Sequence, residues 1–163
     1  MPTLHPPLAL VRVLALSIFA SIIALAGCNA AVNLPLPGTG PLVTVSTRGG
    51  MCPQGACDHS VILDRDGRVH AAAKPPNDLG RVPANVMATL TAAVQATDFA
   101  ALKSHAFTGQ CPVAFDGQEL IFEFGVGATT QRIASCEVDI DWGHPLFKAV
   151  GVALGQWIPI PLT

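Results

Sequence analysis

The chain has 163 residues, of which 50% are hydrophobic and 12% are charged, and its net charge at pH 7 is −2. Domains that bind nucleic acids display clusters of Lys and Arg, so this slightly acidic balance argues against a nucleic-acid partner. The length and the hydrophobic content allow one domain with a buried core.

The N-terminus has the layout of an export signal. Arg12 is followed by an uncharged, mainly apolar run over residues 13–26, in which Ser17 and Ser21 are the polar residues. The run is shorter than the roughly 20 apolar residues that a membrane-spanning helix needs. It ends in small residues, as signal peptides do, and the sequence there is Leu25-Ala26-Gly27-Cys28.

These four residues resemble the bacterial lipobox. The resemblance implies a thioether-linked diacylglyceryl group on Cys28, with acyl chains such as palmitate, and cleavage just before this cysteine. Two or more acyl chains anchor a protein stably to a membrane. We therefore expect a signal peptide at residues 1–27, a lipidated Pro/Gly-rich tether at residues 28–41 and a domain at residues 42–163. The expected location is extracytoplasmic, on the cell membrane or the outer membrane.

Four cysteines remain once Cys28 carries the lipid, and an even number in an exported domain predicts two disulfides. Four cysteines allow three pairings, and their spacing favours one of them. The favoured pairs are Cys52 with Cys57, around a short Pro/Gly-containing loop, and Cys111 with Cys136, around a predicted hairpin. A loop of the second size contributes about 3–4 kcal/mol in the chain-entropy model.

The sequence of the first half of the domain predicts mainly strands. Residues 42–47 are rich in β-branched side chains and predict a strand. Residues 60–63 and 68–72 flank an Asp-Gly turn at residues 64–67, which is a strong hairpin pattern. A loop is expected at residues 74–80. Pro83 then suits the first position of a helix at about residues 84–96, whose apolar side chains follow helical spacing.

In the second half of the domain, residues 98–102 are expected to form a short helical turn with Thr97 as its N-cap. Residues 119–124 and 131–135 are expected to form a hairpin, and residues 145–154 a helix. An extended apolar tail follows at residues 157–162. In the first strand of this hairpin, Leu120, Phe122 and Phe124 share one face and Glu119, Ile121 and Glu123 share the other. The expected fold is α+β: a small antiparallel sheet of two hairpins plus an N-terminal strand, with the main helix and the C-terminal helix packed on one face.

Two sets of residues have the types found in metal sites. Cys52, Cys57 and His59, with His70 further on, could form a zinc or copper site, but an oxidising compartment favours a disulfide between the cysteines. Asp64 and Asp66 lie beside Gly67 as in a calcium loop, but the ligands that should follow are replaced by Arg68, Val69 and His70. We expect no bound metal and no cofactor.

Other polar residues do not form a catalytic pattern. Glu137, Asp139 and Asp141 alternate, which predicts a solvated strand face, with a weak divalent-cation site as the alternative. The serines and histidines lie outside any recognisable nucleophile motif, so the sequence does not predict an enzyme. These residues are Ser60, Ser104, Ser135, His59, His105 and His144.

The segment Cys111-Pro112-Val113-Ala114-Phe115-Asp116, followed by a hairpin and Cys136, resembles the reactive-loop half of the Streptomyces subtilisin inhibitor family. The resemblance implies that Cys111 pairs across the hairpin and that Pro112, Val113 and Ala114 lie in an inhibitory loop. It also implies that the scissile bond offered to a protease is Val113-Ala114, with Val113 as the P1 residue. The second disulfide of that family has no counterpart here, because Cys52 and Cys57 lie earlier in the chain.

The chain also resembles small uncharacterised bacterial lipoproteins that combine a cysteine loop, an Asp-Gly hairpin, a helix and a Cys-Pro hairpin. The main functional hypothesis is a membrane-anchored extracytoplasmic lipoprotein that acts as a non-catalytic binding or envelope module, with an unidentified protein partner. The alternatives are a serine protease inhibitor acting through Val113-Ala114 and a metal-binding module using Cys52, Cys57 and His59.

Overall fold

A computed structural model describes residues 40–51 and 57–161 of the chain. Six strands and three α-helices lie in these segments, together with one short 3-10 helix, η2. Among the described residues, no helix is both long enough and apolar enough to cross a membrane. The elements are β1 (Pro41–Arg48), β2 (His59–Asp64), β3 (Arg68–Ala71), β4 (Asp78–Arg81), α2 (Ala84–Ala96), α3 (Phe99–Lys103), η2 (Pro112–Phe115), β5 (Glu119–Val126), β6 (Thr129–Ala134) and α4 (Pro145–Leu154).

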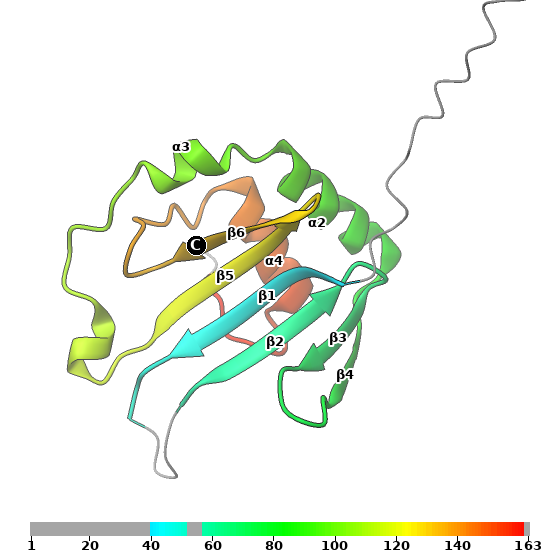
Figure 1. Ribbon diagram of the computed structural model, residues 1–163, viewed down its shortest axis with the longest axis horizontal. Helices are drawn as coiled ribbons and strands as arrows, with labels where there is room; N and C mark the ends of the chain where they lie inside the picture. Colours follow the sequence, from blue (N-terminus) through cyan, green and yellow to red (C-terminus); the bar gives the residue numbers. More distant parts are fainter. Residues whose placement is uncertain (1–39, 52–56, 162–163) are drawn as a thin grey trace, which may run out of the picture. The chain divides into compact units, whose positions relative to one another are not determined.

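The strands form one sheet in the order β4-β3-β2-β1-β5-β6, and every neighbouring pair is antiparallel (Figure 1). The two predicted hairpins, β2–β3 and β5–β6, lie on either side of β1. Val45 of β1 is opposite Val61 on one side and Phe122 on the other. The N-terminal strand therefore joins the two hairpins into a single sheet.

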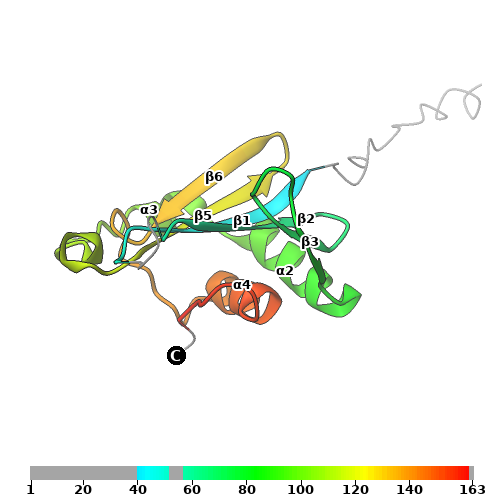
Figure 2. The same cartoon turned by 90° about the horizontal axis from the view of Figure 1, so that it is seen from below.

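Helices α2 and α4 lie together on one face of the sheet (Figure 2). The core forms between them and the sheet because alternate strand residues point to that side. Phe122 and Phe124 are fully buried there, and the ring centroid of Phe122 lies 5.3 Å from that of Phe147 in α4. Leu90 and Val94 are the buried residues of α2. The α+β prediction, with both helices on one face, is confirmed.

Side chains at the helix termini explain where α3 and α4 begin. Asp98 Oδ1 accepts hydrogen bonds from the backbone N–H groups of Ala100 and Ala101 (both 3.0 Å), and so it caps α3. The prediction of Thr97 as this cap is wrong: its hydroxyl instead donates to the carbonyl of Ala93 in α2 (2.6 Å). For α4, His144 Nδ1 accepts from the Leu146 N–H (3.2 Å), and Pro145 occupies the first turn.

The structure departs from the prediction at one edge of the sheet. Residues 74–80 were expected to form only a loop, but Asp78–Arg81 form the edge strand β4, which pairs with β3. The pairing is irregular, with a register shift between Val69 and His70. A four-residue strand that contains a glycine gives too little pattern to be recognised from the sequence.

Candidate functional site

Cys111 and Cys136 form a disulfide with their Cα atoms 5.1 Å apart. The bond connects the residue that precedes η2 to the turn that follows β6, across the β5–β6 hairpin. This is the pairing that the spacing favoured, so that prediction is confirmed. The disulfide fixes the segment that the sequence marked as a possible inhibitory loop.

Cys57 is also disulfide-bonded. Its expected partner, Cys52, lies outside the described residues, as does the expected lipidation site, Cys28. The Thr47 hydroxyl donates to the Cys57 carbonyl (3.2 Å), which holds Cys57 against β1. A cysteine in a disulfide is not a thiolate ligand, so this bond disfavours a metal site that uses Cys57 and His59. Among the described residues, no group of three or more His, Cys, Asp or Glu side chains could hold a metal ion.

The expected inhibitory segment is a turn of 3-10 helix in the structure, and its residues differ in exposure. Val113 is half-buried and packs against Gly49, where an added Cβ would lie 2.8 Å from Val113 Cγ1. Pro112 and Ala114 are exposed, and Phe115 is 66% exposed. Asp116 follows with a left-handed backbone (φ 61°). The segment therefore exposes Phe115 to solvent, while Val113 is only partly accessible.

Asp64 and Asp66 organise the β2–β3 hairpin. Asp64 Oδ2 accepts a hydrogen bond from Arg68 Nη2 (3.0 Å) and lies 3.2 Å from His70 Nε2. Asp66 Oδ1 accepts from the Arg68 backbone N–H (3.0 Å), which is the main reason that the pKa of Asp66 is lowered. The side-chain hydrogen bond to Asp64 likewise raises the pKa of Arg68. Both carboxylates thus have partners within the turn.

The alternating carboxylates near residue 139 lie on the exposed side of their segment, because Val138 and Ile140 between them are buried. Glu137 forms an ion pair with Arg132 (2.6 Å), which raises the pKa of Arg132. Asp139 and Asp141 line a hollow of about 320 Å³.

The other polar residues of this hollow are His105 and His144. Two of the polar side chains in this hollow already accept hydrogen bonds from nearby backbone N–H groups. His144 caps α4, and Asp141 Oδ1 accepts from the Gly143 N–H (2.8 Å).

The candidate serines bond to backbone groups or to each other. Ser60 Oγ lies 2.7 Å from Ser46 Oγ across β1 and β2. Ser104 donates to the Ala101 carbonyl (2.7 Å), and Ser135 accepts from the Leu120 N–H (3.0 Å). In the parts of the chain that the structure describes, no serine hydroxyl is hydrogen-bonded to a histidine, which is the contact that activates a nucleophilic serine.

Glu119 is an unexpected buried carboxylate. It shares a strand face with Ile121 and Glu123, yet its side chain is 0% exposed, whereas Glu123 is exposed. Arg48, directly opposite on β1, forms an ion pair with it. Neither oxygen of Glu119 accepts a well-aligned hydrogen bond from the described residues. The Arg48 guanidinium therefore provides the compensating charge.

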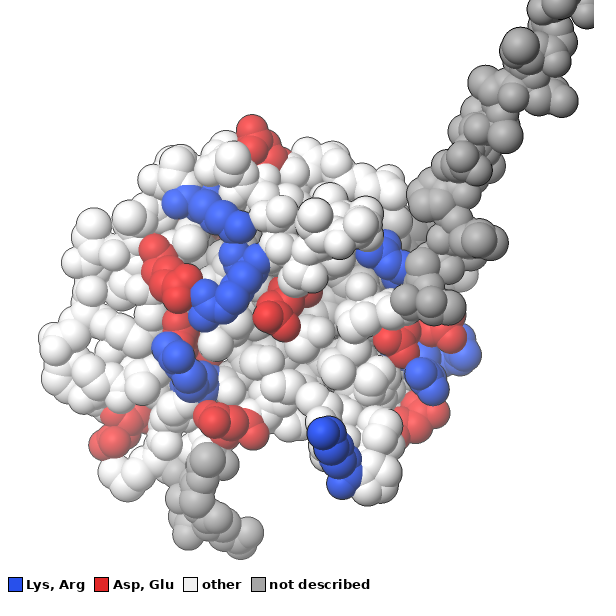
Figure 3. All heavy atoms as spheres, in the orientation of Figure 1, with Lys and Arg blue, Asp and Glu red and all other residues white. Residues whose placement is uncertain are grey.

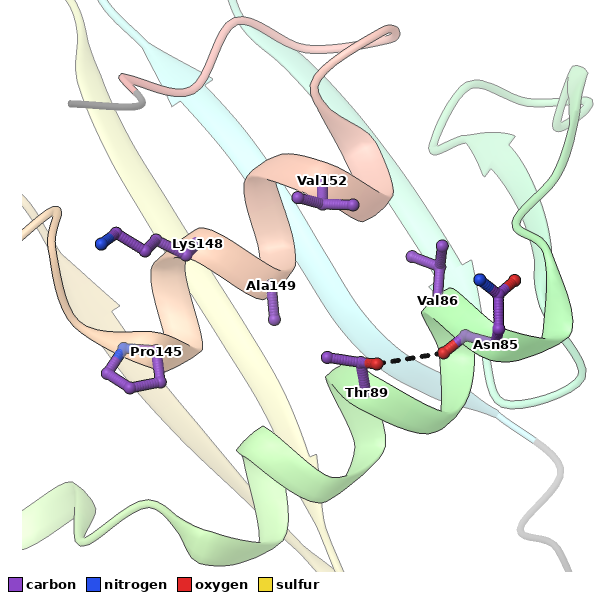
Figure 4. A pocket seen from close by; sticks show the side chains of 7 residues that line it. All are labelled: Asn85, Val86, Thr89, Pro145, Lys148, Ala149 and Val152. Atoms are coloured by element: carbon purple, nitrogen blue, oxygen red, sulfur yellow. Dashed lines mark hydrogen bonds between the residues drawn. The ribbon is translucent and has the colours of Figure 1, made fainter.

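A groove lies between α2 and α4, which the sequence did not predict (Figure 4). Its volume is about 490 Å³. The side chains that line it follow helical spacing on both helices. They are Asn85, Val86 and Thr89 of α2 and Pro145, Lys148, Ala149 and Val152 of α4.

Charged side chains on the face shown in Figure 3 are of both signs and are interspersed. Among the described residues, Arg132 pairs with Glu137 and Arg81 with Asp66. This face therefore has no large patch of one sign that would attract a polyanion or a polycation.

Comparisons of the chain with protein-family models, with curated proteins and with solved structures find no match.

Proposed function

We propose that the protein is a lipid-anchored extracytoplasmic lipoprotein, attached through Cys28, whose domain is a non-catalytic binding or envelope module. The observation that carries the proposal is the Cys111–Cys136 disulfide. Structural disulfides persist in oxidising compartments and are rare in the cytosol. Together with the lipobox-like residues 25–28, this bond supports export and anchoring of the domain.

The polar side chains support a role in binding rather than catalysis. The carboxylates of the β2–β3 turn, the cap of α4 and the serines are engaged in bonds that stabilise the fold. The groove between α2 and α4, in contrast, is a concave surface whose lining is mostly apolar. Pockets of this kind with a few polar groups are typical of ligand sites.

The anchor is tested by expressing the full chain in a bacterium that processes lipoproteins, in medium that contains alkyne-palmitate. We expect the chain to carry the label and to sediment with membranes, and the Cys28→Ala variant to lose both properties while keeping the Cys111–Cys136 disulfide. An unlabelled wild-type chain, or a Cys28→Ala chain that is still labelled, would remove the lipoprotein proposal.

Protease inhibition is a second candidate, favoured by the disulfide that holds Cys111 across the hairpin, as the subtilisin-inhibitor resemblance implies. A disulfide-held loop loses little conformational entropy on binding. Subtilisin and elastase should be titrated with the full chain and with the Val113→Asp variant. Inhibition by the wild type alone would support the candidate, and no inhibition at micromolar concentration would exclude it for these proteases.

A further inference from the structure

We propose that the groove between α2 and α4 binds a single-chain amphiphile with an anionic head, such as a long-chain carboxylate. The acyl chain would lie between the two helices and the head would pair with Lys148. This inference names the ligand class for the binding role proposed above and rests on that role.

The shape and lining of the groove fit an acyl chain. Ala149 forms part of its wall and points toward Thr89 on the facing helix, while Val86 lies further along α2 (Figure 4). Val152 is 68% exposed, an unusually open position for a large apolar side chain in this fold. The volume of about 490 Å³ lies within the roughly 300–1,000 Å³ of small-molecule sites. Occupation by an apolar chain would remove Val152 and its neighbours from water.

The positive charge at the groove favours a ligand with an anionic head group. Helix α2 contains no charged residue, and Lys148 is the single charged residue of α4. Among the described residues, the Lys148 ammonium has neither an ion-pair partner nor a hydrogen-bond acceptor, whereas Lys103 donates to Gln131 Oε1 (2.8 Å). In Figure 4 the Lys148 side chain extends from α4 away from α2, so its ammonium lies at the outer rim of the groove. An unpaired cation at the rim of an apolar groove favours a ligand that combines an anion with an apolar body.

The same observations disfavour larger occupants. A second copy of this chain, docked about a two-fold axis on this groove, would bring two Lys148 side chains together and offer no carboxylate from either helix. A folded protein partner typically contacts about 20–30 residues on each side. Seven residues line this groove. A small amphiphile matches both the charge and the size.

The test uses the full chain, incorporated into phosphatidylcholine nanodiscs, and a palmitate analogue that carries a diazirine and an alkyne. After irradiation, labelled peptides are mapped by mass spectrometry. We expect the label on α2 and α4, displaced by palmitate. Lys148→Gln should raise the half-saturating probe concentration about tenfold, and Val152→Glu should abolish labelling, since it places a carboxylate at the groove. Lys103→Gln and Ala92→Glu, which alter exposed residues outside the lining, should leave labelling unchanged.

Several outcomes would overturn the inference. The first is the absence of label from both helices. The second is displacement of the probe by hexadecyltrimethylammonium as effective as that by palmitate. The third is protection of the groove from the probe by phosphatidylglycerol nanodiscs but not by free palmitate, which would indicate docking on an anionic bilayer. The anchor is read separately, from incorporation into nanodiscs that depends on Cys28. Incorporation without labelling of the groove would therefore exclude the amphiphile site and leave the lipoprotein proposal standing. Labelling of the groove in a chain that is not incorporated would support the amphiphile site and exclude the lipid anchor.

Discussion

The indole Nε1–H of Trp157 donates a hydrogen bond to the backbone carbonyl of Leu79 (3.1 Å), although the two residues are 78 positions apart in the chain. Leu79 lies in the edge strand β4, and Trp157 follows α4. Gly80, the next residue of β4, also approaches the indole, since an added Cβ there would lie 3.4 Å from Trp157 Cζ2. The C-terminal segment thus supports the outer edge of the sheet.

Trp157→Phe should lower the free energy of unfolding by about 1 kcal/mol, because it removes this hydrogen bond and keeps most of the aromatic surface. Urea unfolding of the variant and the wild type measures the difference, and amide exchange at Gly80 and Arg81 should become faster in the variant. Unchanged exchange in β4 would show that the bond does not support the edge strand.

Replacing Cys111 and Cys136 together by Ser should destabilise the domain by about 3–4 kcal/mol, because the disulfide restricts the unfolded chain across the β5–β6 hairpin. The midpoint of denaturant unfolding, measured without reductant, gives the effect. If the double variant unfolded at the same midpoint as the wild type, the disulfide would have no structural role.

Arg48→Ala should destabilise the domain by about 2–3 kcal/mol, because it leaves the buried Glu119 carboxylate without its ion partner. The matched double variant Arg48→Met, Glu119→Leu should recover most of this loss, since an apolar pair needs no compensating charge. Unfolding curves of the three proteins decide the point, and an Arg48→Ala variant as stable as the wild type would contradict the buried-pair explanation.

The Asp66 carboxyl should titrate below its ordinary value of 3.8, chiefly because it accepts the Arg68 backbone N–H. A pKa lowered by folding adds stability above the unfolded-state pKa, and this contribution is lost as the pH falls through the folded-state pKa. A carbon-detected NMR titration measures the pKa of Asp66. Arg81→Ala should raise this pKa only slightly, since Arg81 is a lesser cause of the shift; a full return to the ordinary value would refute this assignment.

Local patterns were sufficient to predict several elements. The Asp-Gly turn at Asp66 and Gly67, between apolar stretches, predicts the β2–β3 hairpin that the structure contains. The apolar spacing after Pro83 predicts α2 with its observed limits, Ala84–Ala96, although Pro83 is the N-cap and not the first helical residue that was predicted. In both places, the residues that determine the structure lie close together in the sequence.

The features that were missed depend on residues far apart in the chain. Strand β4 is short and receives support from Trp157, which no local pattern reveals. The burial of Glu119 depends on Arg48 of the neighbouring strand, and the face pattern of β5 alone suggests an exposed side chain. The groove exists because α2 and α4 pack together, so the role of Lys148 is apparent only from the fold.

The most direct test of the proposed lipoprotein is mass spectrometry of the intact chain purified from membranes of a bacterium that processes lipoproteins. The account predicts a mature chain that begins at Cys28, with a mass increased by a diacylglyceryl group and its acyl chains, and with no free thiol on the four remaining cysteines. A chain that begins at another residue, or that carries an unmodified Cys28, would contradict it.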